Sequence, residues 1–196
     1  MTPSTGEGRR RLVVGLSGSS APQLGIRLLA ALQGRSDVET HLVVSEGARR
    51  SIPLETDLLP EQVIKLADRS YDPGDLAAPI SSGSFMTAGM IVIPCSMRSL
   101  AAIATGNTSD LLTRAADVTL KERRRLVLVT REAPLNLIHI RNMETVTLAG
   151  ATVFPPVFAF YHQPRTIEDL LDHVVGKVLD QFAISHRLFR RWGSAE

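Results

Sequence analysis

Three stretches of small polar residues follow apolar, strand-like runs in this sequence. They are Gly15-Leu16-Ser17-Gly18-Ser19-Ser20, Ser45, and Cys95-Ser96-Met97-Arg98. Glycines let backbone N–H groups approach a phosphate, and a helix that starts there adds a partial positive charge. The first stretch lacks a complete GxGxxG and a Walker lysine, so neither a dinucleotide fingerprint nor a P-loop is predicted. A phosphate cradle and a tight strand-to-helix turn both stay open for it.

A further serine-rich stretch, Ser81-Ser82-Gly83-Ser84, precedes the apolar run Met90–Pro94. Together the loops predict a hydrogen-bonding cradle for a polar, planar ligand, although each serine alone is also typical of a turn or a cap. Cys95 is a candidate nucleophile, but its neighbours offer only Arg98 as an activating charge. We therefore expect a small buried packing residue.

Charged residues gather in two places. Arg114 and Lys121 are seven residues apart, which puts them on one helical face within reach of the same phosphate. The alternative for this charge run is the solvated end of a helix. Arg131-Glu132 directly follows an apolar run. The two residues could form a structural ion pair, or Glu132 could be an acid/base beside an anion site. Tyr161 lies in a loop where packing and a site role are both open.

The five histidines show no spacing typical of metal ligands, and neither HExxH nor GxSxG occurs, so we predict no metal site and read no serine triad. The single cysteine excludes an internal disulfide framework and favours a reducing, cytoplasmic location. Net charge is +2 from 22 basic and 20 acidic residues, and aromatic residues make up 5%, so nucleic-acid binding is not predicted. No apolar run is long enough for a membrane span or a signal peptide.

Strand-like runs alternate with amphipathic, helix-length segments along the chain. Strands are expected over 11–17, 40–45, 90–94, 126–130 and 151–154, and helices over 21–33, 61–67, 100–104, 110–120, 134–149 and 166–182. This alternation predicts a single α/β domain over residues 11–185, with a mostly parallel sheet between two helical layers. Residues 1–10 are expected to form a flexible tail, and residues 186–196 a C-terminal tail. In such a sheet, ligands bind beyond the carboxyl ends of the strands.

The sequence resembles the UbiX-type flavin prenyltransferases from Leu12 to Trp192. The residues that carry the resemblance are Gly15–Ser20, Leu54-Glu55-Thr56-Asp57, Ser81–Phe85, Pro94–Met97, Arg114–Val118, Leu120–Arg124, Arg131-Glu132, Phe160–Pro164 and Arg191-Trp192-Gly193. Ser81–Phe85 and Asp180-Gln181-Phe182 are most similar to the family members that accompany reversible phenolic-acid decarboxylases.

The resemblance implies a flavodoxin-like or Rossmann-like fold and a homo-oligomer, usually a dodecamer. It implies transfer of a dimethylallyl group from dimethylallyl monophosphate to N5 and C6 of reduced FMN without a metal. The product, prenylated FMN, would serve a UbiD-type decarboxylase. The FMN-binding residues would be Gly18, Ser19, Ser20, Ser45, Ser96, Met97 and Arg131. The donor would be held by Arg114, Lys121, Tyr161, Lys177 and Trp192, the last reaching over from a neighbouring chain. Catalytic roles would fall to Ser20, Glu55 and Glu132.

Four positions depart from the family's usual pattern: Ala21, Pro22, Glu46 and Lys177, the last of which replaces a frequent arginine and its bidentate geometry. Two alternatives are a non-catalytic FMN-binding subunit of a decarboxylase and a flavin-dependent cysteine decarboxylase. Against the latter, the chain lacks a Pro-Ala-Ser-Ala-Asn-Thr stretch and a histidine after the second strand. Against the former stands the complete charged set of Glu55, Lys121, Arg131 and Glu132.

Overall fold

Six strands form a fully parallel sheet with the order β3-β2-β1-β4-β5-β6 in the computed structural model, which describes residues 8–193. The strands are β1 (Arg10–Leu16), β2 (Val38–Val44), β3 (Arg69–Tyr71), β4 (Gly89–Cys95), β5 (Arg125–Thr130) and β6 (Thr152–Val153). Every residue of β4 is buried, as expected where helices cover both faces of a parallel sheet.

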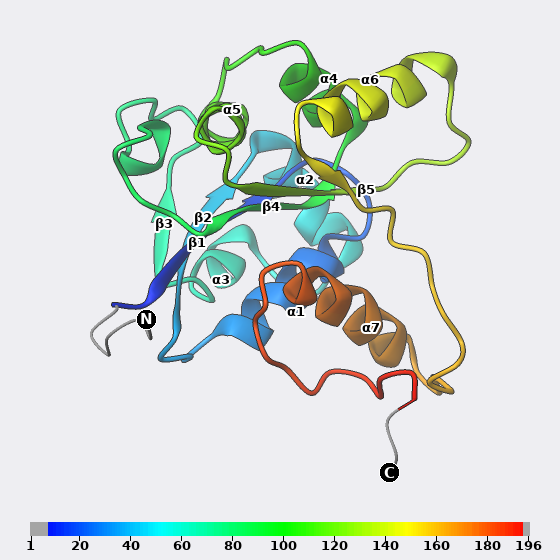
Figure 1. Ribbon diagram of the computed structural model, residues 1–196. Coiled ribbons are helices and arrows are strands. Elements are labelled where there is room, and N and C mark those ends of the chain that lie inside the picture. Colours follow the sequence, from blue (N-terminus) through cyan, green and yellow to red (C-terminus); the bar gives the residue numbers. More distant parts are fainter. Residues whose placement is uncertain (1–7, 194–196) are drawn as a thin grey trace, which may run out of the picture.

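Helices cover both faces of this sheet (Figure 1). One layer contains α1 (Pro22–Leu32), α2 (Glu46–Glu55), α3 (Pro60–Ile64) and α7 (Ile167–Asp180). The other contains α4 (Met97–Ala104), α5 (Leu111–Lys121) and α6 (Leu137–Leu148). Each layer closes its own apolar core against the sheet, which confirms the predicted three-layer α/β fold. No helix in the described part of the chain is both long and apolar enough to cross a membrane.

Side-chain caps set where several helices begin. Asn136 accepts a hydrogen bond from the backbone N–H of His139 at 2.9 Å, so α6 starts at Leu137. The helix expected over 134–149 was therefore placed too early. Asp110 caps α5 in the same way, at 2.8 Å from the Thr113 N–H. Such caps satisfy backbone donors that the first helical turn leaves unpaired.

Two elements were not predicted. The helix α2 contains Pro53 and buries only Ala48 and Ile52, so its apolar periodicity is too weak to identify it from sequence. The strand β3 has three residues, none of them fully buried, at the edge of the sheet. The expected N-terminal tail lies outside the described residues up to residue 7, and Arg10 already begins β1.

The neighbouring strands β1 and β4 mark the point where the strand order reverses. The chain passes from β1 to β2 on one side and from β4 to β5 on the other, which opens a crevice at the carboxyl ends. The loops after the two strands lie side by side there, because the Ser17 N–H donates to the Pro94 carbonyl at 3.2 Å. This crevice is where the serine-rich loops were expected to meet.

Candidate functional site

A buried hydroxyl ties the loops after β1 and β4 together. The Oγ of Ser17, which is 1% exposed, donates to the Pro94 carbonyl at 3.0 Å and accepts from the Ser96 N–H at 2.7 Å. Because this bridge holds the two loops next to each other, Ser96 and Gly18 line the same pocket. The sequence analysis assigned Ser17 no role of its own.

Gly18 lies directly against Gly47, the second residue of α2. A Cβ added at Gly18 would lie 2.7 Å from the Cα of Gly47, closer than two carbon atoms pack. The loop after β1 therefore passes within backbone contact of the N-terminus of α2, and no other residue type fits at Gly18. Gly47 was missed as a site residue; its place two residues after Ser45, at the end of a predicted strand, was the available signal.

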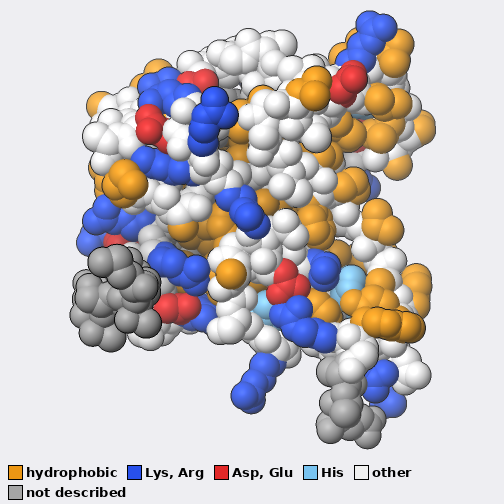
Figure 2. Space-filling view, viewed as in Figure 1, with side chains coloured by type: hydrophobic (Ala, Val, Ile, Leu, Met, Phe, Trp, Pro, Cys, Tyr) orange, Lys and Arg blue, Asp and Glu red, His pale blue; other side chains and the backbone are white. Residues whose placement is uncertain are grey.

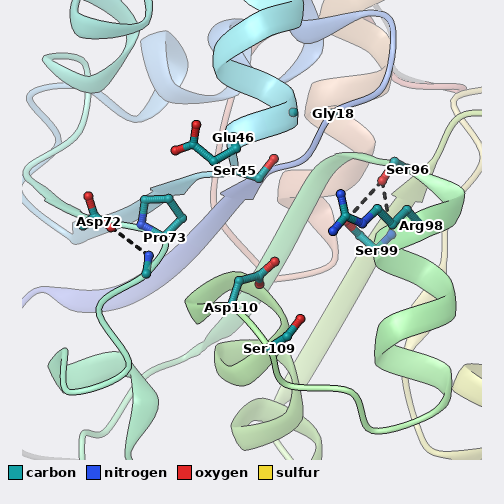
Figure 3. A pocket seen from close by; sticks show the side chains of 12 residues that line it. Gly18, Ser45, Glu46, Asp72, Pro73, Ser96, Arg98, Ser99, Ser109 and Asp110 are labelled. Carbon is teal, nitrogen blue, oxygen red and sulfur yellow. Dashed lines mark hydrogen bonds between the residues drawn. The ribbon is translucent and has the colours of Figure 1, made fainter.

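Two serine-capped helices begin at this point (Figure 3). Ser45 caps α2 by accepting from the Ala48 N–H, and Ser96 caps α4 by accepting from the Ser99 N–H, both at 3.2 Å. The first-turn N–H groups and the helix dipoles make such termini favourable for anions. They open on a pocket of about 460 Å³ lined by Gly18, Ser45, Glu46, Gly47, Asp72, Pro73, Gly74, Ser96, Arg98, Ser99, Ser109 and Asp110.

Three of the predicted FMN-binding residues line this pocket, namely Gly18, Ser45 and Ser96. Met97 is the first residue of α4 and packs partly against the core below it. Among the described residues that line the pocket, Arg98 is the one arginine or lysine, and the sequence analysis did not assign it to the ligand. Its side chain points from the first turn of α4 toward the pocket (Figure 3).

Glu55 and Ser20 are in contact, although they are 35 residues apart. The Glu55 Oε2 accepts from the Ser20 hydroxyl at 2.8 Å and from the Ala21 N–H at 2.9 Å. Ala21 is the N-cap of α1 and has no capping side chain, so the Glu55 carboxylate serves that helix terminus instead. The carboxylate is thereby fixed next to the loop that carries Gly18.

Arg131 and Glu132 follow β5 at the same edge of the sheet. The Ser19 hydroxyl donates to the Arg131 carbonyl at 3.2 Å, and the Arg131 N–H donates to the Cys95 carbonyl at 3.3 Å. Glu132 accepts from the Ala133 N–H at 3.1 Å. Over residues 8–193, no ion pair joins Arg131 to Glu132, so this structure does not support a simple structural pair between them.

Cys95 is fully buried between the sheet and the α4–α6 layer. Burial raises the pKa of its thiol to about 12, because an apolar environment disfavours the thiolate. The expectation of a packing residue is confirmed, since a thiol in this state is a poor nucleophile.

A second cluster lies along α5. Arg114 donates to the Ser81 carbonyl at 3.1 Å and pairs with Asp117 at 2.7 Å. Lys121, the last residue of α5, pairs with Glu122, and this contact lowers the pKa of the Glu122 carboxyl. Both cations thus lie along the Ser81–Ser84 loop. Their reach to one phosphate stays a prediction.

Within one chain, the Ser81–Ser84 loop does not line the pocket shared by Gly18, Ser45 and Ser96, which corrects our expectation that the serine loops meet. The loop precedes β4 and is held by Arg124, whose guanidinium donates to the Gly83 carbonyl at 2.6 Å just before β5 begins. Its Gly83 end therefore lies at the amino edge of the parallel sheet, whereas the pocket lies at the carboxyl edge. Within one chain, Lys121 and the pocket are at opposite ends of α5.

A third cluster contains Tyr161 and Trp192, whose ring centroids are 5.5 Å apart at nearly perpendicular planes. They line a cavity of about 290 Å³ with Arg190, Arg191 and Gly193. The Tyr161 hydroxyl is 3.1 Å from Nε2 of His173, which lies one turn before Lys177 on α7. Trp192 was expected to act on a neighbouring chain; here it meets Tyr161 of its own chain.

In the described residues, no group of three or more His, Cys, Asp or Glu side chains is arranged to hold a metal ion. His162 and His173, which the sequence analysis left without a role, lie beside Tyr161. Their separation of 11 residues carries no recognisable motif.

The chain closely matches known proteins over nearly its whole length. The family model described as Flavoprotein matches residues 1–179. Flavin prenyltransferase UbiX of Escherichia coli (strain K12) is 51% identical over 188 residues, which cover 95% of this chain and 100% of that protein.

Two solved structures agree with this match. The crystal structure of AnUbiX (PadA1) in complex with FMN and dimethylallyl pyrophosphate has a TM-score of 0.92 and 55% identity, over 96% of this chain and 100% of that chain. A dodecameric FMN-dependent UbiX-like decarboxylase from Escherichia coli O157:H7 has a TM-score of 0.92 and 51% identity, over 94% of this chain and 100% of that chain. The protein described here therefore belongs to the UbiX family of flavin prenyltransferases.

Proposed function

We propose that this flavin prenyltransferase joins the dimethylallyl group of dimethylallyl monophosphate to N5 and C6 of reduced FMN, without a metal. The bond from the allylic carbon to the phosphate oxygen would break as N5 bonds to that carbon and gives up its proton, and phosphate would leave. The remaining double bond would then take up a proton, and C6 would bond to its far carbon and lose the C6 proton. The observation that carries the proposal is the contact of Glu55 with Ser20 and the Ala21 N–H, beside a serine-capped pocket at the carboxyl edge of the sheet.

The residues of the crevice fit FMN. The backbone contact of Gly18 with Gly47 keeps that side of the pocket free of side chains, and the capped N-termini of α2 and α4 suit a phosphate. Gly18, Ser19, Ser20, Ser45, Ser96, Met97 and Arg131 would hold the flavin, and the structure adds Arg98 to this set. When reduced and bound, FMN supplies the nucleophilic N5 and C6 atoms.

Glu55 and Ser20 would hold the hydroxyl proton of Ser20 in a defined position beside the flavin atoms that react. The Ser20 hydroxyl donates to the Glu55 carboxylate, so its own oxygen keeps a lone pair for a donor on the flavin. Glu132, at the end of β5 and not paired with Arg131, would exchange a proton with the departing phosphate or with C6.

The donor phosphate would be held by Arg114, Lys121, Tyr161, Lys177 and Trp192. Negative charge develops on the phosphate oxygen as the allylic bond breaks, and fixed cations stabilise that charge. Because Lys121 lies at the amino edge of its own sheet, it reaches the pocket of a neighbouring chain rather than its own. The site proposed here is thus shared between subunits.

A homo-oligomer, with the dodecamer of the Escherichia coli O157:H7 relative as the expected form, fits the surface. On α6 only Val146 is buried, whereas Leu137, Ile138, Ile140 and Leu148 are each at least half exposed. Apolar side chains gather over α6 and near the C-terminal part of the chain (Figure 2). Exposed apolar patches of this kind are typical of protein interfaces.

Prenylated FMN would leave this protein to serve a UbiD-type decarboxylase. The reaction would run in the cytoplasm, where a single reduced thiol such as Cys95 is stable. Neither nucleic acid nor a membrane is part of the proposal.

The decisive experiment supplies the purified protein with reduced FMN and dimethylallyl monophosphate under anaerobic conditions. We expect the mass of the flavin to rise by one isoprene unit. A flavin that stays bound but unchanged in mass would contradict the proposal and favour a non-catalytic FMN-binding subunit. Replacing the donor by dimethylallyl pyrophosphate in a parallel reaction tests which phosphate ester is used.

A further inference from the structure

Tyr161 is surrounded by a cluster of rings from three parts of the chain. Its hydroxyl is 3.1 Å from Nε2 of His173, and its ring meets the edge of Trp192 at 5.5 Å. His162 stacks on His173 with ring centroids 4.7 Å apart and planes 7° apart. Phe189 packs on the same imidazole at 4.8 Å. The imidazole of His173 therefore packs against both rings.

A glycine on α7 makes room for this cluster. A Cβ added at Gly176 would lie 2.6 Å from ring carbons of both His186 and Phe189. The C-terminal segment can thus lie directly on α7 and bring Phe189 against His173. The orientation of His173 follows from packing of the fold and does not depend on a mobile side chain.

His173 is neutral in this environment. Its side chain is 6% exposed, and burial lowers its pKa, with the positive charges of His162 and Lys177 acting in the same direction. A neutral imidazole has one N–H, and within residues 8–193 only one ring nitrogen of His173 has a partner. Nε2 faces the Tyr161 hydroxyl, whereas Nδ1 is buried without a hydrogen-bond partner in that range.

The position of the single proton decides what the tyrosine does. With the proton on Nδ1, an N–H would be buried without an acceptor, and the Tyr161 hydroxyl would have to donate its hydrogen bond to Nε2. With the proton on Nε2, the N–H donates to the Tyr161 oxygen, and only an unpaired acceptor is buried at Nδ1. Buried donors without a partner are the rarer case in proteins.

We propose that His173 is a positioning residue for the prenyl donor: its Nε2–H donates to the Tyr161 oxygen, so that the tyrosine O–H is free to donate to the donor phosphate. His162 keeps the imidazole in plane by stacking. The inference rests on the proposed function, in which Tyr161 binds the phosphate of dimethylallyl monophosphate. It adds a residue that touches neither the flavin nor the donor.

The test measures the dissociation constant of dimethylallyl monophosphate by calorimetry, with the full-length protein saturated with oxidised FMN so that no prenyl transfer occurs. His173→Leu should weaken donor binding by about three- to tenfold, the effect of one net hydrogen bond. His173→Gln places an amide N–H near the position of Nε2 and should restore most of the affinity. His173→Asn reaches only the position of Nδ1 and should not.

Combining the variants separates positioning from packing. If His173 acts through Tyr161, then His173→Leu should cause no further loss of donor affinity in a Tyr161→Phe background. An equal loss in both backgrounds would show that His173 merely supports the loop, and would overturn the inference. Equal donor affinities for the Gln and Asn variants would overturn it as well.

His41 offers a matched control. Its Nδ1 lies 2.8 Å from the Tyr71 hydroxyl, and its side chain is 3% exposed, so His41→Leu removes a buried His–Tyr contact elsewhere in the fold. We expect donor affinity to stay unchanged in this variant; a loss equal to that of His173→Leu would contradict the inference. If the parent protein neither binds the donor nor changes the mass of reduced FMN, the proposed function itself fails. If the parent protein binds the donor and prenylates FMN but the variants do not show the expected donor affinities, only the role of His173 is rejected.

Discussion

Ala21 adopts a left-handed backbone conformation, with φ of 68°, at the N-cap of α1. A side chain disfavours this conformation. The Glu55 carboxylate stabilises it by accepting a hydrogen bond from the Ala21 N–H. Ala21 is one of the four positions that depart from the family's usual pattern, so this departure affects backbone strain at the residue that links Glu55 to α1. A non-glycine residue of this kind next to a ligand site indicates that the surrounding contacts determine the local conformation.

Ala21→Gly should therefore stabilise the protein by up to about 1 kcal/mol, because relief of strain exceeds the extra entropy of a glycine in the unfolded chain. Chemical denaturation measures the free energy of unfolding. The control is Ala30→Gly, at an exposed position within α1, where the same substitution should cost about 0.5–1 kcal/mol. Equal losses at both positions would show that Ala21 is not strained.

Glu132→Gln tests the proton carrier. Glutamine keeps the shape and the hydrogen-bonding capacity of the side chain but does not exchange a proton at useful rates. The variant should bind FMN and dimethylallyl monophosphate and lose roughly a hundredfold to ten-thousandfold in the rate of prenylation. The exposed Glu61 on α3 gives the control, since Glu61→Gln should keep the parent rate. A parent rate for Glu132→Gln would leave the mechanism without this proton carrier.

At the scale of elements, the pocket depends on how closely two loops approach. The first turns of α2 and α4 line the same pocket because Gly18 lies against Gly47 and the Ser17 hydroxyl bridges to the Ser96 N–H. Serine caps at Ser45 and Ser96 leave the helix termini intact without bulky side chains. The geometry of the pocket thus depends on the β1–α1, β2–α2 and β4–α4 connections together.

Gly18→Ala should disrupt this junction. Its Cβ would lie 2.7 Å from the Gly47 backbone, so the two loops must separate, at a cost of about 1–3 kcal/mol in the free energy of unfolding. Because the anion site is built from that contact, FMN binding measured by flavin fluorescence should weaken as well. Gly8→Ala, where an added Cβ meets nothing within 4 Å, is the control and should change neither quantity. Normal FMN affinity in Gly18→Ala would place the flavin elsewhere.

At the scale of the whole molecule, Lys121 and the pocket of the same chain lie at opposite edges of the sheet. Lys121 ends α5 at the amino edge, whereas Ser109 and Asp110, just before α5 begins, line the pocket at the carboxyl edge. The apolar surface of α6 suits contact with another chain. Both observations fit a shared site in a homo-oligomer.

Mixed oligomers provide the test of a shared site. Lys121→Ala should raise the donor concentration needed for turnover while leaving FMN affinity unchanged, and Tyr161→Phe should weaken donor binding as well. If the two residues act in one site from different chains, co-expressed oligomers that contain both variants should form some sites with neither substitution. We expect their donor requirement to move back toward that of the parent. Activity no higher than the average of the two separate variants would place both residues in one chain's own site.

The pH dependence of stability follows from two buried histidines. Burial is the main cause that lowers the pKa of both His41 and His173 below the usual histidine value of 6.5. Well above pH 6.5 both residues are neutral in the folded and unfolded chain, and their contribution is complete. Below it the unfolded chain binds protons that the folded chain does not, so the free energy of unfolding falls as the pH falls toward the lowered pKa values.

Chemical denaturation between about pH 5 and pH 8 should therefore show lower stability on the acid side. The double variant His41→Gln, His173→Gln should show a shallower dependence over this interval, whatever its stability at neutral pH. An unchanged slope would mean that other groups cause the acid effect. Asp37, Asp68 and Asp180, whose pKa values are lowered from 3.8, act only at more acidic pH.

Local residue patterns were enough to predict the layers of the fold and the edge of the sheet at which the polar loops after the strands meet. Buried parallel strands such as Met90–Pro94 are continuously apolar, and amphipathic helices show their period, so local pattern was enough to predict the α/β sandwich. Since parallel strands end at one edge, it also predicted that Gly18, Ser45 and Ser96 would meet. It failed for α2 and β3, whose short or polar segments carry little periodicity.

Only the tertiary structure decided which charged groups meet. Contacts such as Glu55 with Ser20, or Tyr161 with His173, join residues whose separation along the chain follows no helical or strand period. The strand order and the direction of each connection determine these neighbours, as they placed Ser81–Ser84 at the amino edge, away from the other serine loops. Such long-range placement depends on packing of the whole sheet, which no local pattern of residue types encodes.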